Sequence, residues 1–241
     1  MTRTLITAAA AVASLSLALG ALAAEPPPAP APAPEAKAAL TGDLAAAVAG
    51  VEARYREVTD FSASFAQQVR RAHLPRPLNK SGKVYYKAPG MMRWDYTQPE
   101  RVYYVSDGEV LWSYEQTTGQ VIKMSVKDSE LYDSLKFLFG KGDLAGSFDI
   151  TAAPRSDDGL VGLVLAPKKS QSNYKSLTLY ADPAKSWEIA RTELVDPLDN
   201  VSVIELSDLS YDTLKREGFA FKPPKGANVQ DLTAQGGGKK R

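Results

Sequence analysis

The order of apolar and polar residues divides the chain into one helical stretch followed by a series of short strands. Over residues 40–58 the apolar positions recur three or four residues apart, which places them on one face of an amphipathic helix. These positions are Leu44, Val48, Val51, Tyr55 and Val58. From Phe61 to Val69 apolar and polar residues alternate instead, which is the period of a strand with one apolar face. The pattern predicts a helix that covers a sheet.

Aromatic residues gather between Lys83 and Tyr114, a stretch that holds six of the eleven tyrosines and two of the three tryptophans. Its runs of Val, Tyr and Trp suit a pleated sheet. Turn signals separate these runs at residues 88–90, 97–100 and 106–109. The stretch therefore predicts a four-stranded antiparallel meander. Asp107-Gly108 is its strongest hairpin signal, and we expect both residues at φ > 0.

The remainder of the chain continues with short strands and one further helix. Strands are predicted at residues 120–125, 148–152, 160–166, 177–181, 187–194 and 201–209. Residues 128–139 return to helical spacing, and Phe219 and Phe221 lie on a final extended piece. Roughly eleven strands with few helices predict a mainly β (α+β) fold, a half-barrel of antiparallel strands. The two helices each have one apolar face and must bury it against the concave side of that sheet.

The two ends of the chain have compositions of their own. Residues 1–23 combine Arg3, an Ala/Leu-rich run and an Ala-Leu-Ala site, which is typical of a cleaved signal peptide. The alternative is an uncleaved membrane anchor. Residues 24–39 alternate Pro and Ala and predict an extended linker, either a spacer or a disordered leader. Residues 231–241 form a polar tail that we expect to be disordered.

Charge and cysteine content exclude several kinds of partner and site. The chain has 29 basic and 28 acidic residues, and loss of Arg3 with a signal peptide would bring the net charge from +1 to zero. Such a balance gives no electrostatic reason to bind nucleic acid or an acidic membrane. The absence of cysteine excludes disulfides, thiolate metal sites and a lipidated N-terminal Cys. Any partner is then met chiefly through apolar surface.

No catalytic or metal-binding pattern is visible in the sequence. The one histidine, His73, lies in the basic, proline-containing loop of residues 70–80 without a nucleophile motif beside it. That loop is either a solvated turn or a contact for an acidic partner. Asp157 and Asp158 belong to a turn signal, and the glycines form no phosphate-binding loop. We predict that the protein is not an enzyme and needs no cofactor or metal.

Several short motifs in register resemble the LolA family of periplasmic outer-membrane lipoprotein carriers. In the meander they are Tyr86-Lys87-Ala88-Pro89, Arg93-Trp94-Asp95-Tyr96, Gln98-Pro99-Glu100, Val105-Ser106-Asp107-Gly108 and Leu111-Trp112-Ser113-Tyr114. Outside it they are Phe61–Gln67, Leu163–Lys168, Glu193–Asp196 and Phe219–Gly226. The resemblance covers about residues 40–230, which we treat as one carrier domain.

The resemblance implies a fold and a function. The fold is an unclosed eleven-strand barrel with helices as a lid over an apolar cavity. The family shields the acyl chains of lipoproteins between an inner-membrane ATP-binding-cassette exporter and the outer-membrane receptor LolB. That receptor shares the fold but is lipidated on an N-terminal Cys, so this chain corresponds to the soluble, monomeric periplasmic carrier. A cavity of this kind holds acyl chains through buried apolar area, at about 0.8 kcal/mol per CH2.

The resemblance also suggests site residues. The family's lid-locking arginine stands immediately before the proline of Lys87-Ala88-Pro89, where this chain has alanine. Lys87 and Arg93 are candidates to take its place in lid or partner contacts. Met92, where the family usually has Phe, supplies a flexible thioether suited to an acyl chain. The residues expected to line the cavity or the lid are Val51, Tyr55, Phe65, Met92, Trp94, Tyr103, Trp112, Leu135 and Leu138.

Two other functions remain open from the sequence. A LolA-like sensor that binds a lipid or lipoprotein and regulates an envelope-stress pathway is the main alternative, although such proteins usually carry a second domain. An envelope hydrolase would need a positioned nucleophile or carboxylate pair, and the sequence contains neither.

Overall fold

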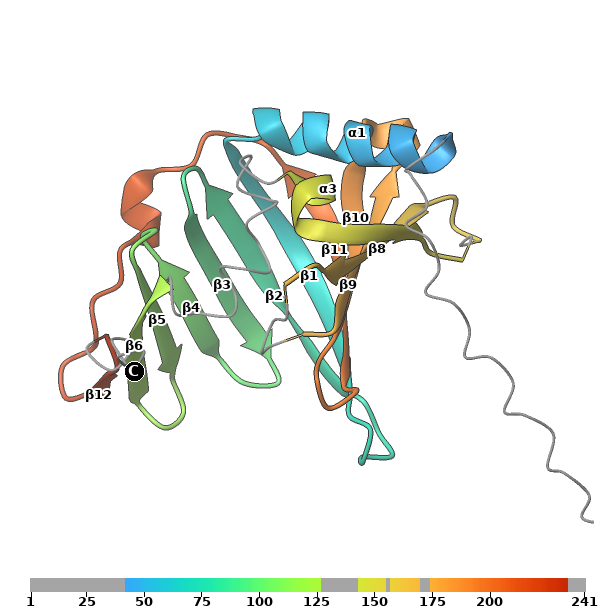
Figure 1. Cartoon of the computed structure of the whole chain (residues 1–241). Coiled ribbons are helices and arrows are strands. Elements are labelled where there is room, and N and C mark those ends of the chain that lie inside the picture. The colour runs from blue at the N-terminus through green and yellow to red at the C-terminus, as the bar shows by residue number, and fades with distance from the viewer. Residues whose placement is uncertain (1–41, 127–142, 155–156, 170–173, 234–241) are drawn as a thin grey trace, which may run out of the picture. The chain divides into compact units, whose positions relative to one another are not determined.

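A strongly curled β-sheet with one long helix across its end makes up most of the computed structural model, which describes residues 42–126, 143–154, 157–169 and 174–233 (Figure 1). The elements are α1 (Asp43–Glu57), β1 (Asp60–Arg70), β2 (Leu78–Lys87), β3 (Met91–Gln98), β4 (Val102–Ser106), β5 (Val110–Glu115), β6 (Gln120–Ser125), α3 (Leu144–Ser147), β7 (Phe148–Ala152), β8 (Val161–Pro167), β9 (Ser176–Asp182), β10 (Glu188–Val195), β11 (Val201–Ser210) and β12 (Asn228–Asp231), with short 3-10 helices η2 (Pro183–Lys185) and η3 (Arg216–Phe219). Within these ranges no helix is long and apolar enough to cross a membrane.

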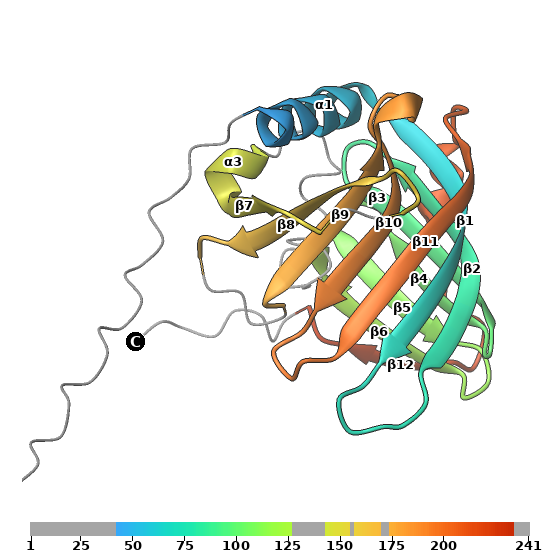
Figure 2. The ribbon, with the colours of Figure 1, turned by 90° about the vertical axis from the view of Figure 1, so that its right-hand side faces the viewer.

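The strands follow the order β12-β6-β5-β4-β3-β2-β1-β11-β10-β9-β8-β7 in one sheet. The sheet does not close, because β12 and β7 are its two edges. It curls so that β3–β6 lie behind β9–β11 when the molecule is viewed from the side (Figure 2). The mainly β, unclosed architecture expected from the sequence is thus confirmed.

Most strands begin and end within a residue of the positions that the hydrophobic pattern predicts. The aromatic stretch is the expected four-stranded meander, β2 to β5. The basic loop is shorter than predicted, because β1 and β2 pair as far as Val69 and Leu78. The predicted helix over residues 128–139, with Leu135 and Leu138, lies outside the described residues.

The hairpin at Asp107-Gly108 differs from the prediction. Gly108 has φ +97°, but Asp107 is not among the residues with positive φ. The Asp107 carboxylate instead accepts hydrogen bonds from the amides of Glu109 and Val110, at 2.9 and 2.8 Å. The side chain therefore completes the turn, so only one residue needs the left-handed conformation.

Strand register divides the meander into two faces. Phe61, Tyr86 and Met92 lie opposite one another on β1, β2 and β3, as do Ala63, Val84 and Trp94. These side chains join the buried face of α1 in one hydrophobic core, and we call this face of the sheet the inner face. The buried residues of α1 are Ala47, Val48, Val51 and Tyr55.

The opposite, outer face of the meander is covered by the C-terminal part of the chain. After β11 the chain crosses to the far edge of the sheet, where β12 pairs in parallel with β6 (Figure 1). Phe219 is 3% exposed, and the Phe221 ring lies 5.6 and 5.8 Å from the rings of Trp112 and Tyr114. Phe219 lies at the end of η3 rather than on an extended piece as predicted. Nor did the polar pattern after Gly226 predict β12.

A close backbone approach at Gly82 sets the spacing of the inner face. A Cβ there would lie 2.0 Å from the Asp95 carbonyl oxygen and 3.0 Å from the Phe65 ring. We therefore expect Gly82→Ala to lower the free energy of unfolding by about 1–3 kcal/mol, as overpacking does. Urea denaturation measures this. Gly218→Ala is the control, since its Cβ would meet nothing within 4 Å. Equal stabilities of the two variants would contradict the prediction.

Candidate functional site

The inner face of the meander carries a cluster of aromatic rings centred on Phe65. The Phe65 ring lies 4.9 Å, edge to face, from the rings of both Trp94 and Tyr96, and Tyr96 lies 5.9 Å from Tyr104. Phe65 is 3% exposed, whereas Trp94, Tyr96 and Tyr104 are only half-buried. Alternation along β1, β3 and β4 brings these rings to one side of the sheet. The result is an apolar surface that extends beyond the packed core.

The phenols of this surface are neutral, and the Lys80 ammonium lies over the Tyr96 ring at 5.5 Å from its centre. Burial raises the pKa of Tyr86 to about 12 and also raises the pKa of Tyr96, so both phenols stay neutral at physiological pH. The Tyr96 hydroxyl donates to the side-chain oxygen of Gln67 at 3.1 Å, and the Gln67 amide donates to Ser202 at 2.8 Å. The Trp94 indole N–H is buried and has no hydrogen-bond partner among the described residues.

α1 covers the core from the side of β8, β10 and α3. The backbone amide of Ile189 donates to the Tyr55 hydroxyl at 2.9 Å, and burial raises the pKa of this phenol. On the same helix, the Glu52 carboxylate accepts a hydrogen bond from the Leu144 amide of α3 at 2.8 Å. The helix is thus attached by directional bonds as well as by its apolar face.

Gly50 gives α1 a notch in which Trp187 packs. A Cβ at position 50 would lie 2.3 Å from the Trp187 indole nitrogen. Trp187 and the preceding Ser186 have φ of 63° and 53°, a conformation that bulky side chains rarely adopt. The turn before β10 is therefore held in an unusual shape that directs the indole against the helix.

The C-terminal end of α1 meets a buried carboxylate. Asp60, 7% exposed, accepts hydrogen bonds from the Lys87 ammonium at 2.7 Å and the Leu214 amide at 3.0 Å. Burial alone would raise the pKa of Asp60, but these hydrogen bonds outweigh it and lower that pKa. One residue thus joins the start of β1, the end of β2 and the segment that covers the outer face.

The structure brings together five of the residues predicted to line the site. Val51, Tyr55, Phe65 and Met92 are buried in one core cluster, and Trp94 packs against it. Lys87 alternates with the inner-face residue Tyr86 and forms its ion pair with Asp60 instead. Leu135 and Leu138 lie outside the described residues.

Three predicted residues lie on the outer face instead. Tyr103 pairs with Asp95 and Tyr114, and Trp112 pairs with Val105, all of which alternate with the inner-face positions. Arg93 also points outward, where it bonds Asp95 and the Gly218 carbonyl. Their aromatic or basic character suggested the site, but their strand parity places them away from α1.

The sequence analysis did not select several residues of the inner face. Tyr96 continues the alternation of Met92 and Trp94 along β3, so a period of two residues could have identified it. Tyr104 lies opposite Trp94 on β4. The other half of the sheet contributes Leu163, Leu165 and Leu179, which are fully buried. No group of metal ligands occurs among the residues that the structure describes. The site is suited to binding an apolar ligand.

The sequence of the chain matches a known family over most of this region. The family model for the outer membrane lipoprotein carrier protein LolA matches residues 56–222. The chain belongs to the LolA family. The match begins near the end of α1 and extends past η3, so it includes both faces of the meander.

Two relatives named outer-membrane lipoprotein carrier protein agree with this assignment, and one solved structure has a similar fold. The outer-membrane lipoprotein carrier protein of Bordetella pertussis is 28% identical over 150 residues, covering 62% of this chain and 70% of the relative. The protein of the same name from Neisseria meningitidis serogroup B is 27% identical over 199 residues, covering 80% and 93%. An uncharacterized conserved protein from Thermus thermophilus has a similar fold, with TM-score 0.50, 15% identity and coverage of 78% and 98%.

A substitution at Gly50 tests how α1 is held. Helix propensity alone predicts that Gly50→Ala stabilises the protein by about 1 kcal/mol. Because the new methyl group would collide with Trp187, we expect destabilisation and faster amide exchange across α1. Hydrogen exchange with urea denaturation measures both quantities. The double variant Gly50→Ala/Trp187→Ala relieves the collision and should recover part of the lost stability, while α1 stays less protected than in the parent because the Trp187 contact is absent. A stabilised Gly50→Ala protein would show that Trp187 does not hold the helix.

The lowered pKa of Asp60 predicts a pH dependence of stability. Its bonds to Lys87 and Leu214 should stabilise the fold above the unfolded pKa of about 3.9, and that contribution is lost as the pH falls through the lower folded pKa. Asp60→Asn should therefore be less stable than the parent at pH 7, and the difference should shrink below about pH 4. Urea denaturation at several pH values measures it, with the exposed Asp149→Asn as control. A pH-independent difference would refute this role.

Proposed function

We propose that this protein is a periplasmic carrier that shields the acyl chains of lipoproteins and takes no part in bond-making chemistry. The observation that carries the proposal is a cluster of half-buried aromatic rings that continues the apolar core under α1, in a chain of the LolA family. The signal peptide predicted for residues 1–23 supports export to the periplasm. The relatives' name, outer-membrane lipoprotein carrier protein, supports lipoproteins as the cargo.

The inner face offers what an acyl chain needs. Phe65, Trp94 and Met92 present rings and a thioether, and each CH2 buried there contributes about 0.8 kcal/mol. The unpaired indole N–H of Trp94 supplies one donor for an ester or amide carbonyl at the head of the chain. Such a surface binds by area rather than by shape, so it suits cargo that varies in its protein part.

Movement of α1 would regulate access to this surface. Ala88 cannot supply the side-chain bonds of the family's arginine, and its amide donates instead to the Thr59 carbonyl at 2.7 Å. In this chain we assign the holding of α1 to the Gly50–Trp187 contact and the Tyr55–Ile189 hydrogen bond. Cargo would displace the helix by binding more tightly to the open state than to the closed state.

The wider pathway follows from family membership as a proposal. The carrier would receive lipoproteins from an inner-membrane ATP-binding-cassette exporter and pass them, as a monomer, to an outer-membrane receptor resembling LolB. Handover to a receptor needs only that the receptor offers a better apolar site, so no cofactor enters the scheme.

Native mass spectrometry of the protein incubated with a purified triacylated lipoprotein tests the proposal. We expect a one-to-one complex, and Trp94→Ala should weaken it about tenfold or more because a ring of the inner face is lost. Trp112→Ala is the matched control, since it removes the same side chain from the outer face. Equal loss in both variants would argue against inner-face binding. Binding of free lipid without any lipoprotein would favour the sensor instead.

A further inference from the structure

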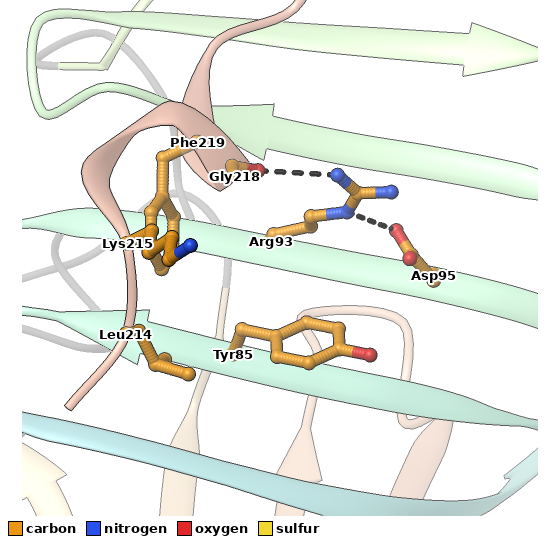
Figure 3. Close-up of a pocket in the computed structure, with 7 residues that line it drawn as sticks. All are labelled: Tyr85, Arg93, Asp95, Leu214, Lys215, Gly218 and Phe219. Atoms are coloured by element: carbon orange, nitrogen blue, oxygen red, sulfur yellow. Dashed lines mark hydrogen bonds and ion pairs between the residues drawn. The ribbon is translucent and has the colours of Figure 1, made fainter. Parts of the chain in front are cut away.

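The outer face contains a pocket of about 340 Å³ between the meander and the C-terminal segment. β2 and β3 supply one wall and residues 214–219 supply the other (Figure 3). Tyr85 and Arg93 face each other across the two strands and alternate with the inner-face residues Val84 and Trp94. The pocket therefore opens on the side of the sheet away from α1.

Arg93 is held in a fixed orientation in this pocket. Its Nε donates to Asp95 at 2.8 Å and its Nη1 donates to the Gly218 carbonyl at 3.1 Å, as Figure 3 shows. Among the described residues the guanidinium has no further hydrogen-bond partner, which leaves N–H groups available to a ligand. A guanidinium fixed on two sides loses little freedom on binding, and its fork matches the two oxygens of a carboxylate.

The remaining lining combines positive charge with apolar walls. Asp95 offsets one cation, and Lys215 has no ion pair within the described part of the chain, so the pocket carries an excess of positive charge. The side chains of Tyr85, Leu214 and Phe219 supply apolar contact, and Phe219 is almost fully buried. This lining is complementary to an anionic group attached to an apolar or aromatic stem.

The volume restricts the size of the ligand. About 340 Å³ lies at the lower end of the range of small-ligand sites, roughly 300–1,000 Å³. That space suits one side chain with its carboxylate rather than an extended lipid. An internal Asp or Glu would place the carboxylate and an apolar group on separate side chains, whereas a C-terminal residue carries both.

We propose that the outer pocket binds the carboxyl end of a partner protein whose last residue is apolar or aromatic, with the carboxylate on Arg93 and the side chain against Tyr85 and Phe219. This site is separate from the inner face and does not depend on what the inner face binds. Capture of a chain end by donors fixed in advance is a recurrent mode of peptide recognition.

The test is an NMR titration of the isotope-labelled full chain with N-acetyl-phenylalanine, which carries the ring and the carboxylate of such an end. We expect saturable shifts at residues 214–219 and at Arg93 Nε, with a Kd on the order of 1 mM. N-acetyl-phenylalanine amide should bind at least tenfold more weakly. Equal binding of the amide overturns the proposal. Equal binding of acetate reduces the pocket to an adventitious ion site only, and tighter binding of octanoate assigns it to free fatty acids.

A pair of charge-matched variants locates the site. Arg93→Gln should weaken N-acetyl-phenylalanine binding at least tenfold, whereas Lys83→Gln should not change it. Lys83 lies on the same face, opposite Asp95 in the strand register, but it does not line the pocket. Arg93→Lys should give an intermediate affinity, because it keeps the charge and loses the fork. Equal affinities of all three variants would overturn the assignment to Arg93.

Discussion

The aromatic meander carries large rings on both of its faces, and the need to bury both faces determines the rest of the structure. A two-layer fold covers one side of a sheet and leaves the other to water. Here α1 covers the inner core from the side of β8, β10 and α3, and the C-terminal segment covers the outer face through Phe219 and Phe221. Within the described part of the chain each cover is short compared with the sheet, so neither buries its face completely. The half-buried rings inside and the pocket outside are both consequences of this incomplete cover.

The two covers meet at one carboxylate. Asp60 begins β1 shortly after the end of α1, and it binds Lys87 of the meander and the amide of Leu214, which lines the outer pocket. A buried carboxylate with a cation and an amide is costly to leave unpaired. The end of the helix and the start of the C-terminal segment are therefore held at a common point. Movement of either cover has to preserve this junction or replace its hydrogen bonds.

Period-two alternation predicted the strands well, because each strand of the meander is flanked by Pro or Gly turns that appear in the sequence. It did not predict which face Tyr103 and Trp112 occupy. The face that a residue occupies depends on how many residues each turn contains. At Asp107-Gly108 the Asp107 side chain completes the turn, whereas the sequence pattern predicted positive φ at both residues. The family resemblance selected aromatic residues without regard to the face of the sheet that they occupy. The alternation that places Met92 and Trp94 on the inner face also places Tyr96 there. The contact between Gly50 and Trp187 joins positions far apart in the chain, and no local pattern indicates it.

The position of α1 bears on how the proposed carrier would open. The helix packs chiefly on β8, β10 and α3, and its hydrogen bond to Ile189 and its contact with Trp187 both lie on that half of the sheet. The aromatic cluster around Phe65 lies on the other half, on β1, β3 and β4. A ligand that enters over the aromatic half therefore meets half-buried rings before it meets the anchored helix. The apolar area gained there can offset the loss of part of the α1 contact while the bonds to β10 remain. In this arrangement the helix need not be released completely, and the energy difference between its open and closed positions is smaller than the full free energy of packing.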